Sequence, residues 1–351
     1  MSVTSSVSTL TGVVPEVQAA RVAIAHDHAT GMQAVIAIDD TTRGPGLGGV
    51  RWMPYPDLDA AVAEASRLAR GMTLKNALAE LPYGGAKSVI LSHDDGADRA
   101  SVLRAFGRMV ADLRGAYIPG VDMGTSIEDL AVIGSVGAEV ACNHEDPSPW
   151  TALGVYAAIA AAVRHVDHSE LDGHRVVVQG AGHVGSSLAL RLADAGVEVL
   201  VTDIDPDRSE RVATSVGGRA VEPEEALAIS CDVLAPCAQA RVITPANAPI
   251  LGARIVAGAA NDMLSERSCA AELAGAGITY VPDFLLNAGG VIHIHAIRSG
   301  WDRRRLGEAV MEIGIRTGEV LERADASGRS PLDIAEEMAT DRLGHPVSVP
   351  L

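Results

Sequence analysis

Lysine is scarce in this chain, and its two lysines lie close together. The stretch GMTLKNALAELPYGGAKSVI contains Lys75 and Lys87, and every other basic residue among the 28 lysines and arginines is an arginine. An arginine guanidinium stays protonated in a protein, whereas a lysine ammonium loses its proton when burial or a neighbouring charge disfavours the charged form. The pair predicts a site in which a lysine serves as a base, although a bias towards arginine would equally leave two lysines by accident.

Two elements must position these lysines. Residues 57–81 carry apolar side chains three and four apart, which predicts a helix with Asp57 as its N-cap and Lys75 near its end. Pro82 and two glycines then break the helix, and KSVIL reads as a short buried strand. A helix, a tight Gly-Gly turn and a returning strand can bring Lys75 and Lys87 into one pocket.

The rest of the N-terminal part mixes strands and helices. AVIAIDD predicts a strand, TTRGPGLGGVRW a turn-rich segment, residues 99–115 a helix, and IPGVDMGTSIEDLAVI a strand end, a loop and a new helix. The segment CNHEDPSPW, with two prolines, interrupts this periodicity. We expect a domain boundary there, followed by a helix over TALGVYAAIAAAVRHV.

The second half of the chain alternates strands with helices, which predicts a parallel sheet covered on both faces. The predicted strands are VVVQ, VEVLVTD, CDVLAP, RIVAGAA and ITYVPDFLL. Gly180, Gly182 and Gly185 have the GxGxxG spacing between the first of these strands and a helix, and Asp203 ends the next strand. The full pattern predicts a Rossmann domain that binds a dinucleotide, where three glycines alone would indicate little.

Each part of this pattern has a physical task. Gly180 permits a tight turn, Gly182 lets the backbone approach a pyrophosphate, and Gly185 lets the helix pack against the sheet, while the helix N-terminus offers free N–H groups. Asp203 would accept hydrogen bonds from the adenosine ribose and repel a 2′-phosphate, which favours NAD over NADP. Arg208 lies near enough in sequence to weaken that preference.

Composition narrows the class of protein. A formal charge of −17 makes nucleic acid or an anionic membrane an unfavourable partner. The four cysteines form no CxxC pair, which is typical of reduced thiols in a cytoplasm, and the first residues read as neither a secretory nor a mitochondrial signal. No apolar run approaches the length of a membrane span. We therefore expect a cytoplasmic protein.

Histidines raise the question of a metal. His293 and His295 would share one face of a strand, but neither an acid nor a thiol accompanies them, and we expect no metal site. His183, inside the glycine loop, is expected to be exposed rather than catalytic.

From about residue 30 to 340, the chain resembles the amino-acid dehydrogenase family that includes leucine, valine, phenylalanine and glutamate dehydrogenases, and is most similar to the leucine, phenylalanine and valine branch. The resemblance is carried by GPGLGGVRW, LARGMTLKNALAELPYGGAKSVI, GVDMGTSIEDL, PSPWTALGVY, QGAGHVG, VLAPCA, VAGAAND and PDFLLNAGGVI. It implies a two-domain α/β fold with a catalytic cleft between an N-terminal substrate and oligomerisation domain (residues 1–148) and a C-terminal Rossmann domain (149–325). Residues 326–351 would pack back on the N-terminal domain.

The implied reaction is NAD-dependent oxidative deamination of an L-amino acid to its 2-oxo acid and ammonia. By resemblance, Lys75 binds the substrate α-carboxylate with backbone around Gly48 and Gly49. Lys87 is the catalytic lysine, which activates water to attack the iminium that hydride transfer leaves. Asp122 handles the amino group and passes protons.

Further positions carry over one by one. Thr151 is expected near the nicotinamide carboxamide, Asn261 at the nicotinamide and substrate edge, and Asn287 on cofactor or substrate through its amide. Without the resemblance, each of the three reads as a turn or helix-start residue. Other expected cofactor contacts are His183, Val184, Cys237 and Ala238.

Four positions bear on the substrate side chain. Glutamate dehydrogenases carry a lysine where this chain has Leu47, so glutamate is disfavoured. Val291 and Ile294 resemble the apolar pocket of leucine and valine dehydrogenases, whereas Gly120 resembles phenylalanine dehydrogenases, in which a missing side chain leaves room for a ring. Because one methylene contributes only about 1–3 kcal/mol of discrimination, branched-chain substrates are favoured and aromatic ones follow closely.

Two other classes of function stay open. An NAD-binding regulatory protein without turnover would be expected to lose some of Lys75, Lys87 and Asp122, which are all present. A hydroxy-acid dehydrogenase would use a histidine paired with a carboxylate, and no histidine falls in such a motif. The resemblance also implies a homo-oligomer, with dimer, tetramer and octamer all open.

Overall fold

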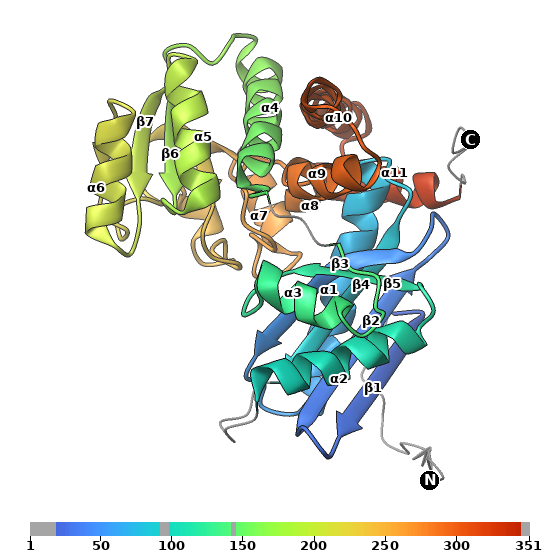
Figure 1. Ribbon diagram of the computed structural model, residues 1–351. Coiled ribbons are helices and arrows are strands. Elements are labelled where there is room, and N and C mark those ends of the chain that lie inside the picture. The colour runs from blue at the N-terminus through green and yellow to red at the C-terminus, as the bar shows by residue number, and fades with distance from the viewer. Residues whose placement is uncertain (1–18, 92–97, 142–144, 345–351) are drawn as a thin grey trace. The chain divides into compact units, whose positions relative to one another are not determined.

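A computed structural model describes residues 19–91, 98–141 and 145–344 (Figure 1). The chain divides into two units by its internal packing. One contains the described residues of Met1–Thr73 and Gly84–Cys142, and the other those of Leu74–Tyr83 and Asn143–Leu351. Cys142 and both chain ends lie outside the described residues, and the domain boundaries after residues 148 and 325 stay predictions. No described helix is both long and apolar enough to cross a membrane.

The first unit is built on a five-stranded sheet with strand order β1-β2-β4-β3-β5. β2 pairs with β1 and β4 in antiparallel fashion, whereas β3 runs parallel to both β4 and β5. The strands of the sheet are β1 (Arg21–Asp27), β2 (Met32–Asp40), β3 (Gly46–Met53), β4 (Gly84–Leu91) and β5 (Tyr117–Val121). The predicted strands over AVIAIDD and KSVIL are confirmed as β2 and β4.

β3 corrects the expectation of a turn-rich segment over TTRGPGLGGVRW. Its glycines are there for close approach between strands rather than for turns. A Cβ on Gly48 would lie 1.7 Å from the carbonyl oxygen of Ala86 on β4, and one on Gly46 would lie 2.7 Å from the Ala86 Cβ. A glycine-rich sequence therefore forms an inner strand of the sheet, where a residue with a side chain would push the neighbours apart.

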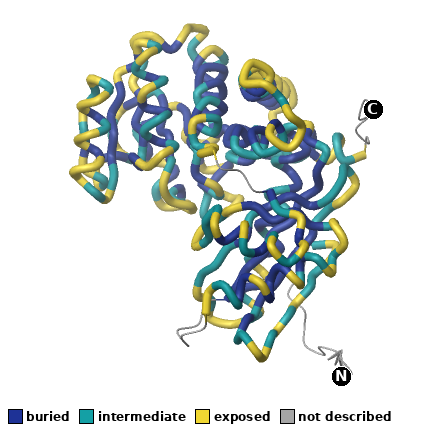
Figure 2. Tube along the Cα trace, viewed as in Figure 1, coloured by how far each residue is buried: buried dark blue, intermediate teal, exposed yellow. Residues whose placement is uncertain are grey.

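Three helices cover the two faces of this sheet: α1 (Leu58–Leu78) on one, and α2 (Arg99–Asp112) and α3 (Ile127–Gly134) on the other. The predicted N-cap is confirmed, because the Asp57 carboxylate accepts a hydrogen bond from the Ala60 N–H at 2.8 Å. Alternation along β2 divides the core, since Ile36 and Ile38 face α2 and α3 while Val35 and Ala37 face α1. β2, β4 and β5 are largely buried, whereas the edge strand β1 is not (Figure 2).

The second unit contains a six-stranded parallel sheet, in the order β11-β10-β9-β6-β7-β8. Its long first helix, α4 (Ser148–Asp167), confirms the helix predicted over TALGVYAAIAAAVRHV. The alternating elements that follow are β6 (Arg175–Gln179), α5 (His183–Asp194), β7 (Glu198–Thr202), α6 (Pro206–Ser215), β8 (Arg219–Ala220), β9 (Cys231–Pro236), η1 (Ala248–Ile250), β10 (Ala253–Val256), α7 (Cys269–Gly275) and β11 (Thr279–Tyr280). The predicted Rossmann architecture is confirmed.

Two expectations in this half were wrong. ITYVPDFLL forms only the short strand β11 before Pro282, whose fixed φ suits the residue before a helix, and α8 (Asp283–Leu286) follows. The segment with His293 and His295 is not a strand but the helix α9 (Gly289–Arg298). Because residues two apart on a helix point in different directions, the two histidines do not share a face.

Helices α10 (Arg303–Ser327) and α11 (Pro331–Leu343) complete this unit. α10 packs against α4 and is seen nearly end-on beside it in Figure 1. Gly314 allows the contact, because a Cβ there would lie 2.8 Å from the Ala157 carbonyl oxygen. α9 also packs on α4, and a Cβ on Gly289 would lie 2.0 Å from the Trp150 carbonyl oxygen. Small residues thus bring three helices into close contact.

Phe106 on α2 offers a test of the first core. It is fully buried among Ile36, Leu130 and Ile133. We expect Phe106→Ala to lower the free energy of unfolding by about 3–5 kcal/mol, because the substitution leaves a cavity, as measured by urea unfolding. Leu190→Ala, at an exposed leucine of α5, is the control and should change it by much less. A similar small loss for both variants would contradict this assignment of the core.

Candidate functional site

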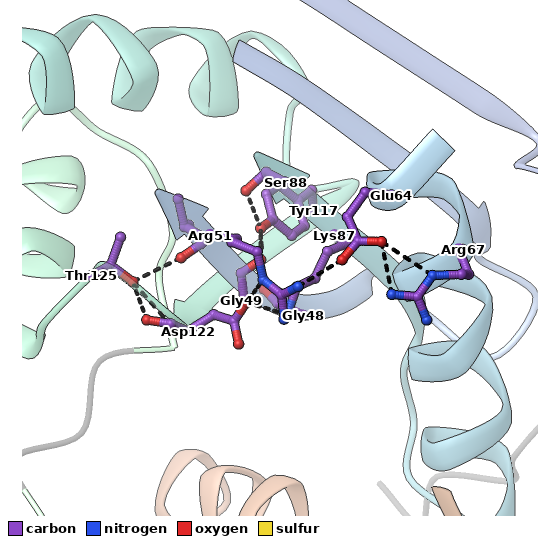
Figure 3. Close-up of polar contacts among 11 residues, drawn as sticks. Gly48, Gly49, Arg51, Glu64, Arg67, Lys87, Ser88, Tyr117, Asp122 and Thr125 are labelled. Atoms are coloured by element: carbon purple, nitrogen blue, oxygen red, sulfur yellow. Dashed lines mark hydrogen bonds and ion pairs between the residues drawn. The ribbon is translucent and has the colours of Figure 1, made fainter. Parts of the chain in front are cut away.

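Lys87 and Asp122 form a buried ion pair in the first unit (Figure 3). Lys87 Nζ lies 2.9 Å from Asp122 Oδ2, and the two side chains are 8% and 16% exposed. Alternation along β4 puts Lys87 on the sheet face of Val89 and Leu91, which α1 covers. Asp122 directly follows β5. Because β3 lies between β4 and β5, the two side chains meet across it.

Gly49 on β3 makes this meeting sterically possible. A Cβ at this position would lie 2.6 Å from the Asp122 Cβ, 2.8 Å from the Val121 carbonyl oxygen and 3.2 Å from Lys87 Nζ. Any side chain would therefore displace the ion pair. The requirement for glycine at position 49 comes from this close approach and not from backbone conformation.

Arg51 is a third member of the group that sequence reasoning missed. Its Nε donates to Asp122 Oδ2 at 2.8 Å, so Asp122 accepts from Lys87 and Arg51 on one oxygen. Arg51 Nη1 donates at 2.8 Å to Glu64 on α1, and Glu64 also binds Arg67. The available signal was the position of Arg51 two residues after Gly49, which places it on the same face of the strand.

In this group, burial and the neighbouring charges shift the pKa values of Lys87 and Asp122 in opposite directions. Burial lowers the pKa of Lys87, and the adjacent Asp122 carboxylate counteracts part of that effect. Burial alone would raise the pKa of Asp122, but the charges and hydrogen bonds of Lys87 and Arg51 outweigh it and lower the pKa to about 2. Asp122 is therefore an anion at neutral pH, next to a lysine whose ammonium form is disfavoured by desolvation.

The strand segment before Arg51 contains other predicted positions. Leu47 is buried, and the Gly48 carbonyl oxygen accepts a hydrogen bond from Tyr117 Oη at 3.1 Å. Gly120 pairs with Gly49 across β3 and β5. Among the described residues, which do not include 142–144 after Ala141, a Cβ on Gly120 would have one neighbour within 4 Å, the Ala141 Cβ at 3.9 Å. Within the described part of the chain, the position is therefore less crowded than Gly48.

Lys75 belongs to a second group, within the other unit. It lies in the last turn of α1, and its Nζ donates to Asn261 Oδ1 at 3.0 Å. Asn287 Nδ2 donates to the same oxygen at 2.9 Å and to the Ala259 carbonyl oxygen at 3.1 Å. The structure thus brings together Lys75, Asn261 and Asn287, which are far apart in sequence.

The glycine loop after β6 has the geometry that a dinucleotide needs. Gly180 has a φ of +108°, and a Cβ on Gly185 would lie 1.8 Å from the Gly180 carbonyl oxygen. Gly182 is exposed, and apart from its chain neighbours no atom of the described residues lies within 4 Å of where a Cβ would be. α5 begins beside it without a side-chain cap. Free N–H groups at an uncapped helix N-terminus, with open space before them, fit a phosphate group.

Asp203 lies beside this loop at the end of β7. Its Oδ2 accepts from the Ala181 N–H at 2.7 Å, and its Oδ1 accepts from the Asp205 N–H at 3.0 Å. Burial alone would raise its pKa, but these backbone hydrogen bonds and Arg208 lower it, so Asp203 is an anion. Arg208 Nη1 lies 3.3 Å from Asp203 Oδ1. Arg208, which the sequence placed near Asp203, is therefore in direct contact with it.

The remaining cofactor positions lie on or beside the same loop. His183 is exposed, as expected, and its Nδ1 lies 3.5 Å from Asp146 Oδ2. Val184 is half-buried in the first turn of α5. The Cys237 N–H donates to the Gln179 carbonyl oxygen at 2.7 Å, and burial raises the pKa of its thiol to about 11. Ala238 lies against Gly180.

Three predicted positions lie where α4 meets α9. Thr151 is in the first turn of α4, and its hydroxyl donates to the Pro147 carbonyl oxygen at 3.3 Å. A Cβ on Gly290 would lie 3.0 Å from Thr151 Oγ1. Val291 and Ile294 are half-buried on α9. His293 of the same helix stacks on Trp150, with ring centroids 6.0 Å apart.

One acidic cluster escaped sequence reasoning because its members come from three separate segments. Ligand atoms of Asp167, His174 and Asp232 lie within 4.8 Å of one another. Arg254 forms ion pairs with both carboxylates, so a cation of the chain already lies against them.

Comparison with known proteins identifies the family. The sequence model described as Glu/Leu/Phe/Val dehydrogenase, dimerisation domain, matches residues 16–136, and the model of Glutamate/Leucine/Phenylalanine/Valine dehydrogenase matches residues 145–206 and 201–296. The chain belongs to the Glu/Leu/Phe/Val dehydrogenase family. The predicted family and two-domain α/β fold are thereby confirmed, and the protein is an amino-acid dehydrogenase.

Individual members of the family are similar over most of their length. The chain is 37% identical to a leucine dehydrogenase of Bacillus subtilis, over 90% of this chain and 89% of that protein. It is 36% identical to a valine dehydrogenase of Streptomyces virginiae, over 92% and 93%. The crystal structure of L-tryptophan dehydrogenase from Nostoc punctiforme superposes with a TM-score of 0.83 at 37% identity, over 94% of this chain and 97% of that one.

The lowered pKa of Asp122, about 2, predicts a pH-dependent contribution to stability. A carboxyl with a depressed folded-state pKa stabilises the fold fully above its unfolded-state pKa of about 3.9, and this contribution is lost as the pH falls towards the folded-state pKa. We expect Asp122→Asn to lower the free energy of unfolding most near neutral pH, with a difference from wild type that shrinks between about pH 5 and pH 2. Urea unfolding across this range measures it, and a difference independent of pH would contradict the ion-pair assignment.

Proposed function

We propose that this amino-acid dehydrogenase catalyses the reversible NAD-dependent oxidative deamination of an apolar L-amino acid, with branched-chain substrates favoured. The products are the 2-oxo acid and ammonia. The observation that carries the proposal is the buried pair of Lys87 and Asp122, because a desolvated lysine beside an ionised carboxylate is suited to proton transfer.

Lys87 and Asp122 divide the proton chemistry. Lys87 in its neutral form takes a proton from the water that attacks the iminium carbon, and burial supports this role because it lowers the pKa of the ammonium. Asp122, 2.9 Å away, moves the proton to and from the substrate amino group. The carbinolamine then releases ammonia, which leaves the 2-oxo acid.

Lys75 binds the substrate α-carboxylate through its ammonium group. Its Nζ is already directed by Asn261 Oδ1 at 3.0 Å, and Asn287 holds that amide from the other side at 2.9 Å. A carboxylate would add a charge-assisted partner to a lysine whose position is set by two amides. Asn261 and Asn287 also lie close enough to one another to hold one edge of a bound cofactor or substrate.

NAD fits the glycine loop of the second unit. The uncapped N-terminus of α5 and the open space at Gly182 would take the pyrophosphate, and the anionic Asp203 would accept the ribose hydroxyls and disfavour a 2′-phosphate. NAD would supply the acceptor for the hydride that leaves the substrate Cα. Thr151, Cys237 and Ala238 are proposed as further contacts.

Apolar residues at the predicted side-chain positions support an aliphatic substrate. Leu47 is a buried leucine where a glutamate side chain would need a cation, and Val291 and Ile294 are branched aliphatics. Similarity to leucine and valine dehydrogenases at 36–37% identity supports the same choice. Leucine and valine are therefore the first substrates to test.

Aromatic amino acids form the second candidate, on one specific observation. Within the described part of the chain, the nearest neighbour of a Cβ built on Gly120 lies 3.9 Å away. An aromatic ring needs such space, and an L-tryptophan dehydrogenase is 37% identical to this chain. Phenylalanine and tryptophan therefore belong in the same assay.

We also propose a homo-oligomer. Residues 16–136 match a model described as a dimerisation domain. β1 lies at the edge of the five-stranded sheet, and an edge strand leaves backbone groups available for pairing with a second copy. Analytical ultracentrifugation distinguishes dimer, tetramer and octamer.

The direct test is NADH formation by the purified protein. We expect turnover with NAD and L-leucine or L-valine, weaker turnover with L-phenylalanine or L-tryptophan, and none with L-glutamate or with 2-hydroxy acids. NADP should support a lower rate, because Asp203 is an anion. Binding of NAD without turnover of any amino acid would instead favour a regulatory protein, and turnover of 2-hydroxy acids alone would favour another class of dehydrogenase.

Lys87→Arg isolates the role of the lysine as a base. The variant keeps a positive charge beside Asp122 but carries a guanidinium that does not lose its proton. We expect kcat for deamination to fall by about 10²–10⁴-fold while NAD binding is unchanged. Arg104→Lys, at an exposed arginine of α2, is the control for arginine-lysine exchange and should keep full activity. Retention of kcat in Lys87→Arg would contradict the assignment of Lys87 as the base.

A further inference from the structure

The carboxylate of Asp122 is held from two sides at a single oxygen. Lys87 Nζ and Arg51 Nε lie 2.9 and 2.8 Å from Asp122 Oδ2. Arg51 in turn reaches Glu64 on α1 at 2.8 Å, so two cations and two anions alternate in a chain across the sheet face (Figure 3). The two members of this chain furthest from Lys87 have no assigned role in the reaction.

We propose that Arg51 and Glu64 are positioning residues, which fix the Asp122 carboxylate against Lys87 and act in opposite directions on the protonation of that lysine. The proposal rests on the proposed function, because it concerns residues assigned there to proton transfer. Neither Arg51 nor Glu64 is assigned contact with the substrate or with NAD.

Geometry supports the positioning role. Arg51 is only 12% exposed and uses two different nitrogens of its planar guanidinium, Nε for Asp122 and Nη1 for Glu64. Because the guanidinium is rigid and planar, these two contacts fix both the rotation of the guanidinium and its distance from the sheet. Asp122 also packs closely against Gly49, so its carboxylate is confined between the Arg51 guanidinium and β3. A lysine at position 51 could not contact both carboxylates in this way.

The placement of the charges supports the second part of the proposal. Arg51 Nε and Lys87 Nζ contact the same oxygen of Asp122, and Glu64 contacts the other end of the Arg51 guanidinium. Burial lowers the pKa of Lys87 and Asp122 raises it, and the nearby positive charge of Arg51 lowers it while the negative charge of Glu64 raises it. Removal of Arg51 should therefore favour the ammonium form of Lys87, and removal of Glu64 should favour the neutral amine.

Other ionisable groups face the same side of the sheet. Asp39 of β2 is also directed at α1, where it accepts from Thr73 Oγ1 and lies 3.6 Å from Arg70. Burial raises the pKa values of Tyr55 and Tyr117, so both phenols are neutral in the working range. Arg67 donates to Glu64 Oε2 at 2.7 Å and lies on the side of Glu64 away from Asp122 (Figure 3). Its side chain is 37% exposed. Arg67 therefore serves as a matched control that removes a cation from Glu64 without touching Asp122.

Two readouts test the proposal in the full-length enzyme with Arg51→Gln, Glu64→Gln and the control Arg67→Gln. The first is the pH dependence of kcat/KM for deamination, whose rise with pH follows the deprotonation of the base. The second does not need turnover. Cyanate carbamylates neutral amines, and because Lys75 and Lys87 are the only lysines, peptide mass spectrometry gives the rate at Lys87 against pH, with Lys75 as internal reference.

The expected shifts have opposite signs. In Arg51→Gln, both the rise in kcat/KM and the carbamylation of Lys87 should move to higher pH, and in Glu64→Gln both should move to lower pH. Arg67→Gln should follow wild type. Arg51→Gln should also lower kcat by about 100-fold with little change in KM, because a misplaced carboxylate impairs the reaction but not substrate binding. Arg51→Lys should keep the wild-type pH dependence and still show the loss of kcat.

The outcomes separate this inference from the proposed function. If wild type forms no NADH but the carbamylation profiles still shift in opposite directions, the proposed function fails and the charge arrangement stands. If wild type turns over and both variants shift in the same direction, or neither shifts, the inference is overturned. If Arg51→Gln does not fold, as circular dichroism would show, Glu64→Gln alone decides by the direction of its shift.

Discussion

The burial of a lysine ammonium beside a carboxylate is the constraint on which the first unit depends. Placing Lys87 under α1 disfavours its charge, and Asp122, reached across a neighbouring strand, is the larger of the two negative charges that offset that cost, with Glu64 the smaller. The pair can form because Gly49 has no side chain to separate it. Arg51 and Glu64 then extend the charge pattern to α1. Two strands, a helix and the segment after β5 are thus linked by one buried electrostatic network.

Both units place their chemistry where side chains are missing. In the first unit, glycines of β3 let strands and functional side chains approach one another to distances that a Cβ would prevent. In the second, the loop after β6 uses a left-handed Gly180 and an open Gly182 to expose the N–H groups at the start of α5. Glycine therefore marks contact between backbones in one unit and access for a ligand in the other.

Much of the fold followed from local patterns, and the misses have definite physical causes. The helix that carries Lys75 and the strands of the Rossmann sheet were predicted, since their periodicity and caps are local. β3 was not predicted, because its glycines are required by close packing against strands that are distant in sequence. The segment that forms α9 was predicted to be a strand from the spacing of His293 and His295. In a short apolar segment such a spacing does not distinguish a strand from a buried helix. Arg51 lies within GPGLGGVRW, but its place in the site could not be predicted from the sequence, because its partner Glu64 lies on another element.

By itself, the sequence determined the class of fold, the family and the residue types available for chemistry. Two lysines among arginines, a glycine fingerprint and an aspartate at the end of the next strand are readable because each depends on identity and spacing alone. The tertiary structure decided which charged and polar groups are in contact. That Lys87 and Arg51 meet on one oxygen of Asp122, and that Lys75 meets Asn261 and Asn287, depends on strand order and helix packing across many residues of chain. Protonation follows from burial and from such neighbours, which no linear spacing encodes.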